Sequence, residues 1–215
     1  MKRIISLTLL FIFLSFAFIS CGDDEIPDRS YNESEVISAA KTLIFKSRDL
    51  NDIFWGKGIA WSDDTSTSQG YYFMADDISL KSYGVENVSD IERITRETFS
   101  EFESNRIFST VFSSISDSTG IQYMARYSQK YADDGVTPEY ILVYTKYPII
   151  FVDTVDYDYE SLRVSGVKGN TVYVDIDCTV TNPEGKSQKR TLTVSLVEES
   201  SGWRIDSPTY CAYSE

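Results

Sequence analysis

Carboxylates and phenols are the side chains of this sequence that could do acid–base chemistry. The candidates are Asp76, Asp77, Asp153, Asp156, Asp158, Tyr123, Tyr127 and Tyr144. A carboxylate and a phenol exchange protons with a substrate only where burial shifts their pKa values towards the working pH. No spacing sets any of these residues apart, and neighbouring acids in so acidic a chain are typical of a solvated surface. We therefore expect no catalytic residues and no enzyme.

Histidine is absent from all 215 residues. Its absence excludes Ser-His-Asp and Cys-His nucleophile systems and removes the commonest zinc ligand. Cys178 and Cys211 do not have the CxxC spacing of a metal site, so we expect neither a metal nor a cofactor. Cys178 belongs to the apolar set of an alternating strand. If the strand at 188–198 separates the two cysteines, their Cα atoms exceed the about 7 Å limit for a disulfide, and we expect both thiols to stay unpaired.

The N-terminus indicates where the chain works. Lys2 and Arg3 precede an apolar run that ends in Phe18-Ile19-Ser20-Cys21, and acids follow directly. This quartet resembles the lipobox of bacterial lipoproteins, in which the peptide is cut before the cysteine and the cysteine carries acyl chains. The resemblance implies a signal peptide at 1–20 and lipidation at Cys21, followed by a polar tether to residue 32. A plain cleaved signal and an uncleaved anchor are the alternatives. We expect an extracytoplasmic protein of the cell envelope, anchored to the membrane by lipid.

The net charge limits the partners. Cleavage before Cys21 would remove Lys2 and Arg3 but no acid, so the formal net charge would change from −13 to −15. Such a chain repels phosphate backbones and has no basic cluster, so nucleic acid is a poor partner. It is not attracted to anionic lipid either, and the acyl chains must therefore hold it at the membrane.

Hydrophobic periodicity predicts helices first and strands afterwards. An amphipathic helix is expected at 33–54. A second helix starts at the capping box Ser89–Glu92, with Ile91, Ile94, Phe99 and Phe102 as its apolar face, and a third covers 105–115. Strands are expected at 71–75, 121–131, 139–147, 159–166, 171–181, 188–198 and 202–207. The apolar faces of 171–181 and 188–198 match only if residues 183–185 form a three-residue loop with Gly185 left-handed. The result is one α+β domain over 33–215.

This order of elements, closing on "SSGWRIDSPTY", resembles the NTF2-like (cystatin-like) fold. The resemblance implies N-terminal helices packed on one curved, mainly antiparallel sheet, with Trp203 and Ile205 facing the core. A narrower stretch, residues 71–100, is similar to secreted inhibitors of bacterial cell-wall DL-endopeptidases through Tyr71, Tyr72, Phe99 and Ser100. No binding residue is carried over from that similarity.

Two polar segments each carry a pair of acids at an expected loop tip. Asp63 and Asp64 lie in "WSDDTSTSQG", and Asp133 and Asp134 lie in "YADDGVTP". Loops on a rigid scaffold often carry binding. We expect a non-catalytic protein-binding or inhibitory domain whose acid pairs contact a basic envelope protein, such as a cell-wall hydrolase. A small-molecule pocket lined by tyrosines (Tyr123, Tyr127, Tyr140 and Tyr144), a purely structural lipoprotein and an Asp/Tyr acid–base enzyme are the alternatives.

Overall fold

The α+β class is confirmed by the computed structural model, which describes residues 30–66, 71–116, 120–148 and 153–213. The helices are α2 (Glu33–Trp55), α3 (Asp77–Tyr83), α4 (Val88–Thr98) and α5 (Glu101–Val111). The strands are β1 (Trp61–Ser66), β2 (Tyr72–Ala75), β3 (Ile115–Ser116), β4 (Gln122–Tyr123), β5 (Tyr127–Tyr131), β6 (Pro138–Tyr144), β7 (Thr154–Lys168), β8 (Thr171–Thr181), β9 (Ser187–Glu199) and β10 (Gly202–Ile205). Among the described residues, no helix has both the length and the apolar character needed to cross a membrane. Cys21 lies outside the described residues.

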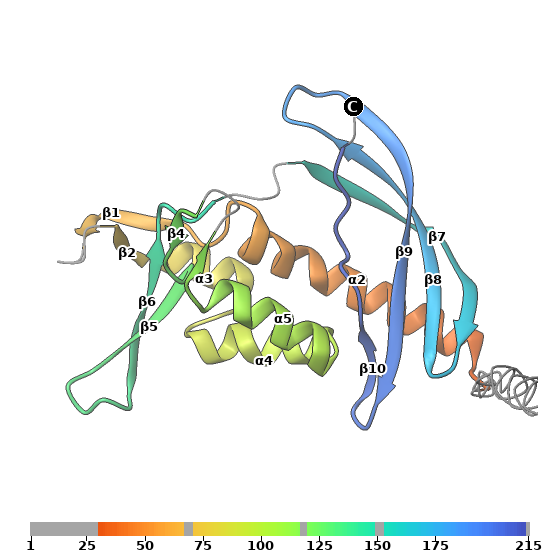
Figure 1. The fold of residues 1–215 in the computed structure, drawn as a ribbon, viewed down its shortest axis with the longest axis horizontal. Coiled ribbons are helices and arrows are strands. Elements are labelled where there is room, and N and C mark those ends of the chain that lie inside the picture. The colour runs from red at the N-terminus through yellow and green to blue at the C-terminus, as the bar shows by residue number, and fades with distance from the viewer. Residues whose placement is uncertain (1–29, 67–70, 117–119, 149–152, 214–215) are drawn as a thin grey trace, which may run out of the picture.

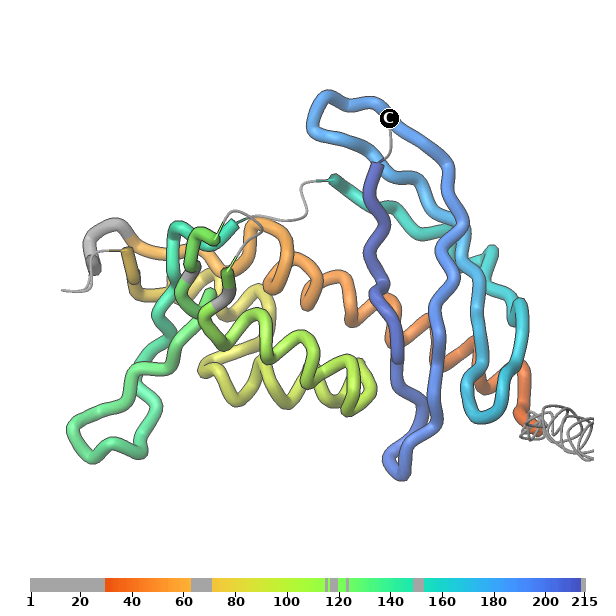
Figure 2. Tube along the Cα trace, viewed as in Figure 1, coloured from red at the N-terminus to blue at the C-terminus, as the bar shows by residue number. Residues whose placement is uncertain are grey.

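The strands form two four-stranded sheets and a small pair, where the sequence analysis expects a single sheet. Sheet A has the order β1-β2-β6-β5, sheet B has the order β10-β9-β8-β7, and β3 pairs with β4. Figure 1 shows the two sheets towards opposite ends of α2, with α4 and α5 between them. The tube in Figure 2 shows the long, strongly twisted strands of sheet B crossing the N-terminal half of α2. Alternation identifies strands but does not say which strand is the neighbour of which, and this is why the division was missed.

The first predicted helix is confirmed almost to the residue. Asn32 caps α2 by accepting hydrogen bonds from the backbone N–H groups of Ser34 (3.1 Å) and Glu35 (3.4 Å). Asn is among the preferred N-cap residues, since its side chain satisfies amides that have no partner in the first turn. The buried stripe of α2 includes Val36 and Ile44, and it packs against both sheets' core residues.

The second and third helices exist, but their ends differ from the prediction. Asn87, not Ser89, caps α4 and accepts the Asp90 N–H at 3.0 Å. Helix α4 ends at Thr98, with Phe99 as its C-cap. Ser100 then caps α5, so the third helix starts earlier than residue 105. Phe102 therefore lies in a different helix from Ile91, and its side chain is 73% exposed instead of packing in the apolar face.

The long hairpin of sheet B is confirmed in detail. Val174 pairs with Val194 across β8 and β9, so the buried residues of the two strands share one face. Asn182 and Lys186 close the turn, with the Asn182 N–H donating to the Lys186 carbonyl at 2.9 Å. Residues 183–185 thus form the predicted three-residue loop, and Gly185 has φ +81°, a left-handed conformation that glycine adopts without a Cβ clash. Ile205 on β10 is fully buried, and Trp203 packs partly buried against the core.

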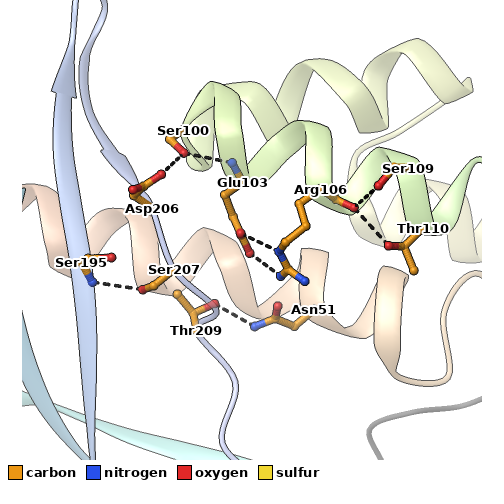
Figure 3. Close-up of polar contacts among 10 residues, drawn as sticks. All are labelled: Asn51, Ser100, Glu103, Arg106, Ser109, Thr110, Ser195, Asp206, Ser207 and Thr209. Carbon is orange, nitrogen blue, oxygen red and sulfur yellow. Dashed lines mark hydrogen bonds and ion pairs between the residues drawn. The ribbon is translucent and has the colours of Figure 1, made fainter.

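The segment after β10 is partly buried, with Thr209 fully buried, and it joins the helices to sheet B. Ser207 accepts the Ser195 N–H at 3.0 Å, and the Asn51 amide of α2 donates to the Thr209 hydroxyl at 3.0 Å (Figure 3). Glu103 of α5 is almost fully buried beside this segment and forms a two-pronged ion pair with Arg106, with N···O distances of 2.7 and 2.5 Å. Polar groups therefore fill this space and hold one another in place.

Candidate protein-binding site

The β5–β6 hairpin is rooted in the core and ends in solvent. At its base Tyr127 and Ile141 are buried, whereas Lys130 on β5 and Glu139 on β6 are exposed. Figure 1 shows that the turn of this hairpin extends away from the helices and from sheet B. The turn thus lies at the tip of the hairpin, as the sequence analysis expects for Asp133 and Asp134.

The Arg126 and Tyr127 side chains bind the hairpin base to the end of α2. The Arg126 guanidinium donates to the carbonyls of Phe54 and Gly56, each at 2.7 Å, and the Tyr127 hydroxyl donates to the Ile53 carbonyl at 2.7 Å. These carbonyls belong to the helix C-terminus, where unpaired oxygens and the helix dipole favour a cation. Arg126 is only 4% exposed. Gly58 lies so close to it that a Cβ at this position would collide with the Arg126 guanidinium and the Tyr127 hydroxyl.

Hydrogen bonds to one carboxylate order the tip. Asp134 Oδ1 accepts the backbone N–H groups of Val136 and Thr137, both at 2.8 Å, and Oδ2 accepts the Thr137 hydroxyl at 2.5 Å. The Ala132 N–H donates to the Thr137 carbonyl at 2.9 Å and closes the turn. Because three donors stabilise the charged form, the pKa of Asp134 falls to about 2. Asp134 therefore stays ionised and gives the turn a defined shape.

The same turn exposes apolar groups and a second acid. Val136 is 76% exposed and Tyr131 is 44% exposed. The exposed carboxylate of Asp133 has no hydrogen-bond or ion-pair partner among the described residues. A single exposed apolar residue needs no explanation, but here two of them flank a free acid on an ordered turn. This set, Tyr131, Asp133, Asp134 and Val136, is called the tip surface below.

The other predicted acid pair lies elsewhere. Asp63 and Asp64 are part of strand β1, not of a loop tip, which corrects the expectation from the sequence. β1 and β5 are the two edge strands of sheet A, separated by β2 and β6. The side chains of Asp63 and Asp64 are outside the described residues. The two acid pairs therefore do not form one continuous surface at the hairpin tip.

Several of the candidate acid–base residues have structural partners instead. Tyr127 holds the end of α2, and Tyr144 packs its ring against Tyr72 with centroids 5.3 Å apart. Asp76 caps α3 by accepting the Ser79 N–H at 2.9 Å, and Asp153 accepts the Tyr213 N–H at 2.8 Å. Asp77, Asp156 and Asp158 are exposed, and the Tyr123 side chain lies outside the described residues.

None of the candidate tyrosines lines either of the two main hollows along the described residues. Nor do three acidic or cysteine side chains gather there as a metal site requires. The residue that sequence reasoning missed is Arg126, since an isolated arginine before a strand has no pattern that marks it as buried.

Comparisons with known proteins found no matching family model, no matching curated protein and no matching solved structure.

Proposed function

We propose that this protein is a non-catalytic, lipid-anchored domain of the cell envelope that docks through the tip surface onto a basic protein, such as a cell-wall hydrolase that it restrains. The observation that carries the proposal is the ordered β5–β6 turn, in which Asp134 holds the backbone while Asp133 and Val136 are left free for a partner. An ordered loop loses little conformational entropy when it binds, and this favours affinity.

The charge of the chain supports a basic partner. The mature chain expected after cleavage at Cys21 has a formal charge of −15, and the tip adds a local carboxylate pair, Asp133 and Asp134. Complementary charge raises the association rate and suppresses wrong partners, and the effect decreases with salt because the Debye length is about 8 Å at physiological ionic strength. Val136 and Tyr131 would supply the apolar contact that charge alone does not give.

A small-molecule site is the second candidate, and one observation favours it. An open hollow of about 610 Å³ lies along β7, β8 and β9, where Asp156, Asp158 and Lys189 are among its lining residues. Binding pockets are mainly apolar and enclose most of their ligand. This hollow is open and carries mainly polar and charged side chains, so it fits a ligand less well than the tip fits a protein.

The experiment uses the chain from residue 22 onward and the purified envelope hydrolases of its own source. Release of soluble fragments from peptidoglycan is measured with rising amounts of the domain, at low salt and at physiological salt. We expect one basic hydrolase to be inhibited, more strongly at low salt. Absence of both inhibition and binding at low salt removes the hydrolase proposal and leaves the small-molecule site to be tested.

A further inference from the structure

Cys178 and Cys211 come from distant parts of the chain but lie in the same region of the core. Cys178 is buried on the inner face of β8, opposite Tyr157 of β7. Cys211 lies in the segment after β10 and packs partly buried against the same core. β9 does lie between β8 and β10, but Cys211 follows β10, so this strand order does not set the distance between the two cysteines; both thiols are free in the structure. The segment that carries Cys211 leaves sheet B after β10, and Cys211 packs against the same core cluster that contains Cys178.

Two hydrogen bonds set the position of Cys211. Two residues before it, the Thr209 carbonyl accepts the hydroxyl of Tyr157, which is the cross-strand neighbour of Cys178. Two residues after it, the Tyr213 N–H donates to Asp153 Oδ2 at 2.8 Å, just before β7 starts. The segment is thus held at both ends along β7, beside the part of β8 that carries Cys178.

The surroundings of Cys178, Cys211 among them, change the pKa of its thiol. Burial raises the pKa of Cys178 to about 11, and interaction with Cys211, through charge and a side-chain hydrogen bond, adds to this rise. Burial also raises the pKa of Tyr157, with contributions from both Cys178 and Cys211.

We propose that Cys178 and Cys211 are a redox pair that forms a disulfide and fastens the C-terminal segment, residues 206–213, to the inner face of sheet B. The pairing is a property of the fold. Its oxidation in the cell follows from the proposed envelope location, where disulfides form and persist. The oxidant belongs to the class of protein or low-molecular-weight disulfides.

The chemistry is two thiol–disulfide exchanges. The Cys211 thiolate, on the less buried residue, attacks a sulfur of the oxidant, forms a mixed disulfide and releases one thiolate. The Cys178 thiolate then attacks Cys211 Sγ, forms the Cys178–Cys211 bond and releases the second thiolate. The two released thiolates take up the two protons lost by the cysteines. The oxidant disulfide is reduced to two thiols as the cysteine pair is oxidised.

The disulfide would stabilise the contact between α2 and sheet B that the C-terminal segment makes. The segment before Cys211 contacts α2 through Asn51 and Thr209, and the Tyr210 ring lies 6.4 Å from the Trp55 ring. A bond from Cys211 to β8 therefore ties these helix contacts to sheet B. Because it closes a loop of about 30 residues, oxidation should raise the melting temperature by roughly 5–15 °C.

The test isolates the mature protein from the envelope in detergent, without reductant, alkylates it after denaturation and digests it with trypsin. Cys178 falls in the peptide 169–186 and Cys211 in the peptide 205–215. Purified, reduced protein is also incubated under native conditions with glutathione disulfide, which tests the pairing whether or not the envelope location and the hydrolase proposal hold. We expect the two peptides to be linked in the oxidised sample and separate after reduction.

Variants make the result decisive even if one of them folds poorly. Cys211→Ser changes the less buried position and should abolish both the linked peptide and the effect of reductant on the melting temperature. Cys178→Ala, an apolar change at the buried position, should leave Cys211 as a glutathione adduct. Two separately alkylated peptides after native oxidation of the parent protein would overturn the proposal, as would separate glutathione adducts on both cysteines.

Discussion

Asp134 accepts both the backbone N–H of Thr137 at 2.8 Å and its hydroxyl at 2.5 Å, so a single ionised carboxylate holds the far side of the β5–β6 turn. This relationship separates the two acids of the tip surface. Asp134 organises the turn, and Asp133 is free to meet a partner. Replacing both acids together would therefore confuse a loss of charge with a loss of shape.

Asp134→Ala should loosen the turn, whereas Asp133→Ala should not. We expect amide hydrogen exchange at Val136 and Thr137 to become faster only in the first variant, because these amides lose their acceptor. Asp134 has a pKa of about 2, below its ordinary 3.8, so its contribution is complete above about pH 4 and is lost as the pH falls through about 2. The difference between parent and Asp134→Ala should shrink over that range. Equal exchange in both variants at pH 6 would contradict this role.

Arg126→Met should destabilise the whole domain, because it leaves the Phe54 and Gly56 carbonyls without their donors in a buried place. We expect a loss of about 2–4 kcal/mol in the free energy of unfolding, measured by urea denaturation. Arg163→Met is the matched control. Arg163 is exposed; it pairs with Asp175 and Asp177 on the surface of sheet B and donates to the Ser161 carbonyl, so its loss should cost less than about 1 kcal/mol. A similar cost for the two variants would show that the hydrogen bonds from Arg126 to the end of α2 contribute little to stability.

Trp203 should behave as a core residue with one dispensable polar atom. Its Nε1–H is buried and has no hydrogen-bond partner among the described residues, while its ring packs against the core. Trp203→Ala should lower the free energy of unfolding by about 3 kcal/mol. Trp203→Phe keeps most of the ring and removes the unpaired N–H, so it should cost less than half as much. If Trp203→Phe is as destabilising as Trp203→Ala in thermal denaturation, the packing of the ring is not what Trp203 contributes.

Sequence pattern predicted the parts of the fold that depend on local chemistry. Alternation and face matching identified β8, β9 and the loop at 183–185, because a register error of one residue would turn every side chain to the wrong face. Helix starts were less certain. Asn87 and Ser89 are both good caps within two residues of each other, and in the structure it is Asn87 that accepts the Asp90 N–H.

The rest of the molecule depends on contacts that have no local pattern. The acids at 133–134 lie at a tip, as expected. Asp63 and Asp64 instead lie in strand β1, which pairs with β2, and this pairing has no signature in the polar sequence between the two strands. Arg126 and the path of Cys211 were missed for the same reason. Each is specified by distant groups, the end of α2 for Arg126 and β7 for Cys211, and not by neighbours in sequence.

The proposed lipid anchor has a direct test. Cells that express the chain are labelled with a fatty-acid analogue, and the Cys21→Ser variant is compared with the parent. We expect the parent to carry the label and the variant to lose it, because Cys21 would bear the acyl chains. Persistence of the label in the variant would show that a residue other than Cys21 carries the acyl chains.

Docking of the tip surface to a basic partner is tested by the rate of association. The tip variant combines Asp133→Asn with Val136→Asn, and leaves Asp134 to hold the turn. The control combines Asp156→Asn on β7 with Ile78→Asn on α3, which changes one exposed acid and one exposed aliphatic residue elsewhere. Both should melt like the parent. Binding to an inhibited envelope hydrolase is then followed by surface plasmon resonance at several salt concentrations. We predict slower association and at least about tenfold weaker binding for the tip variant alone. Equal binding by the tip variant, the control and the parent would rule out docking through the tip surface.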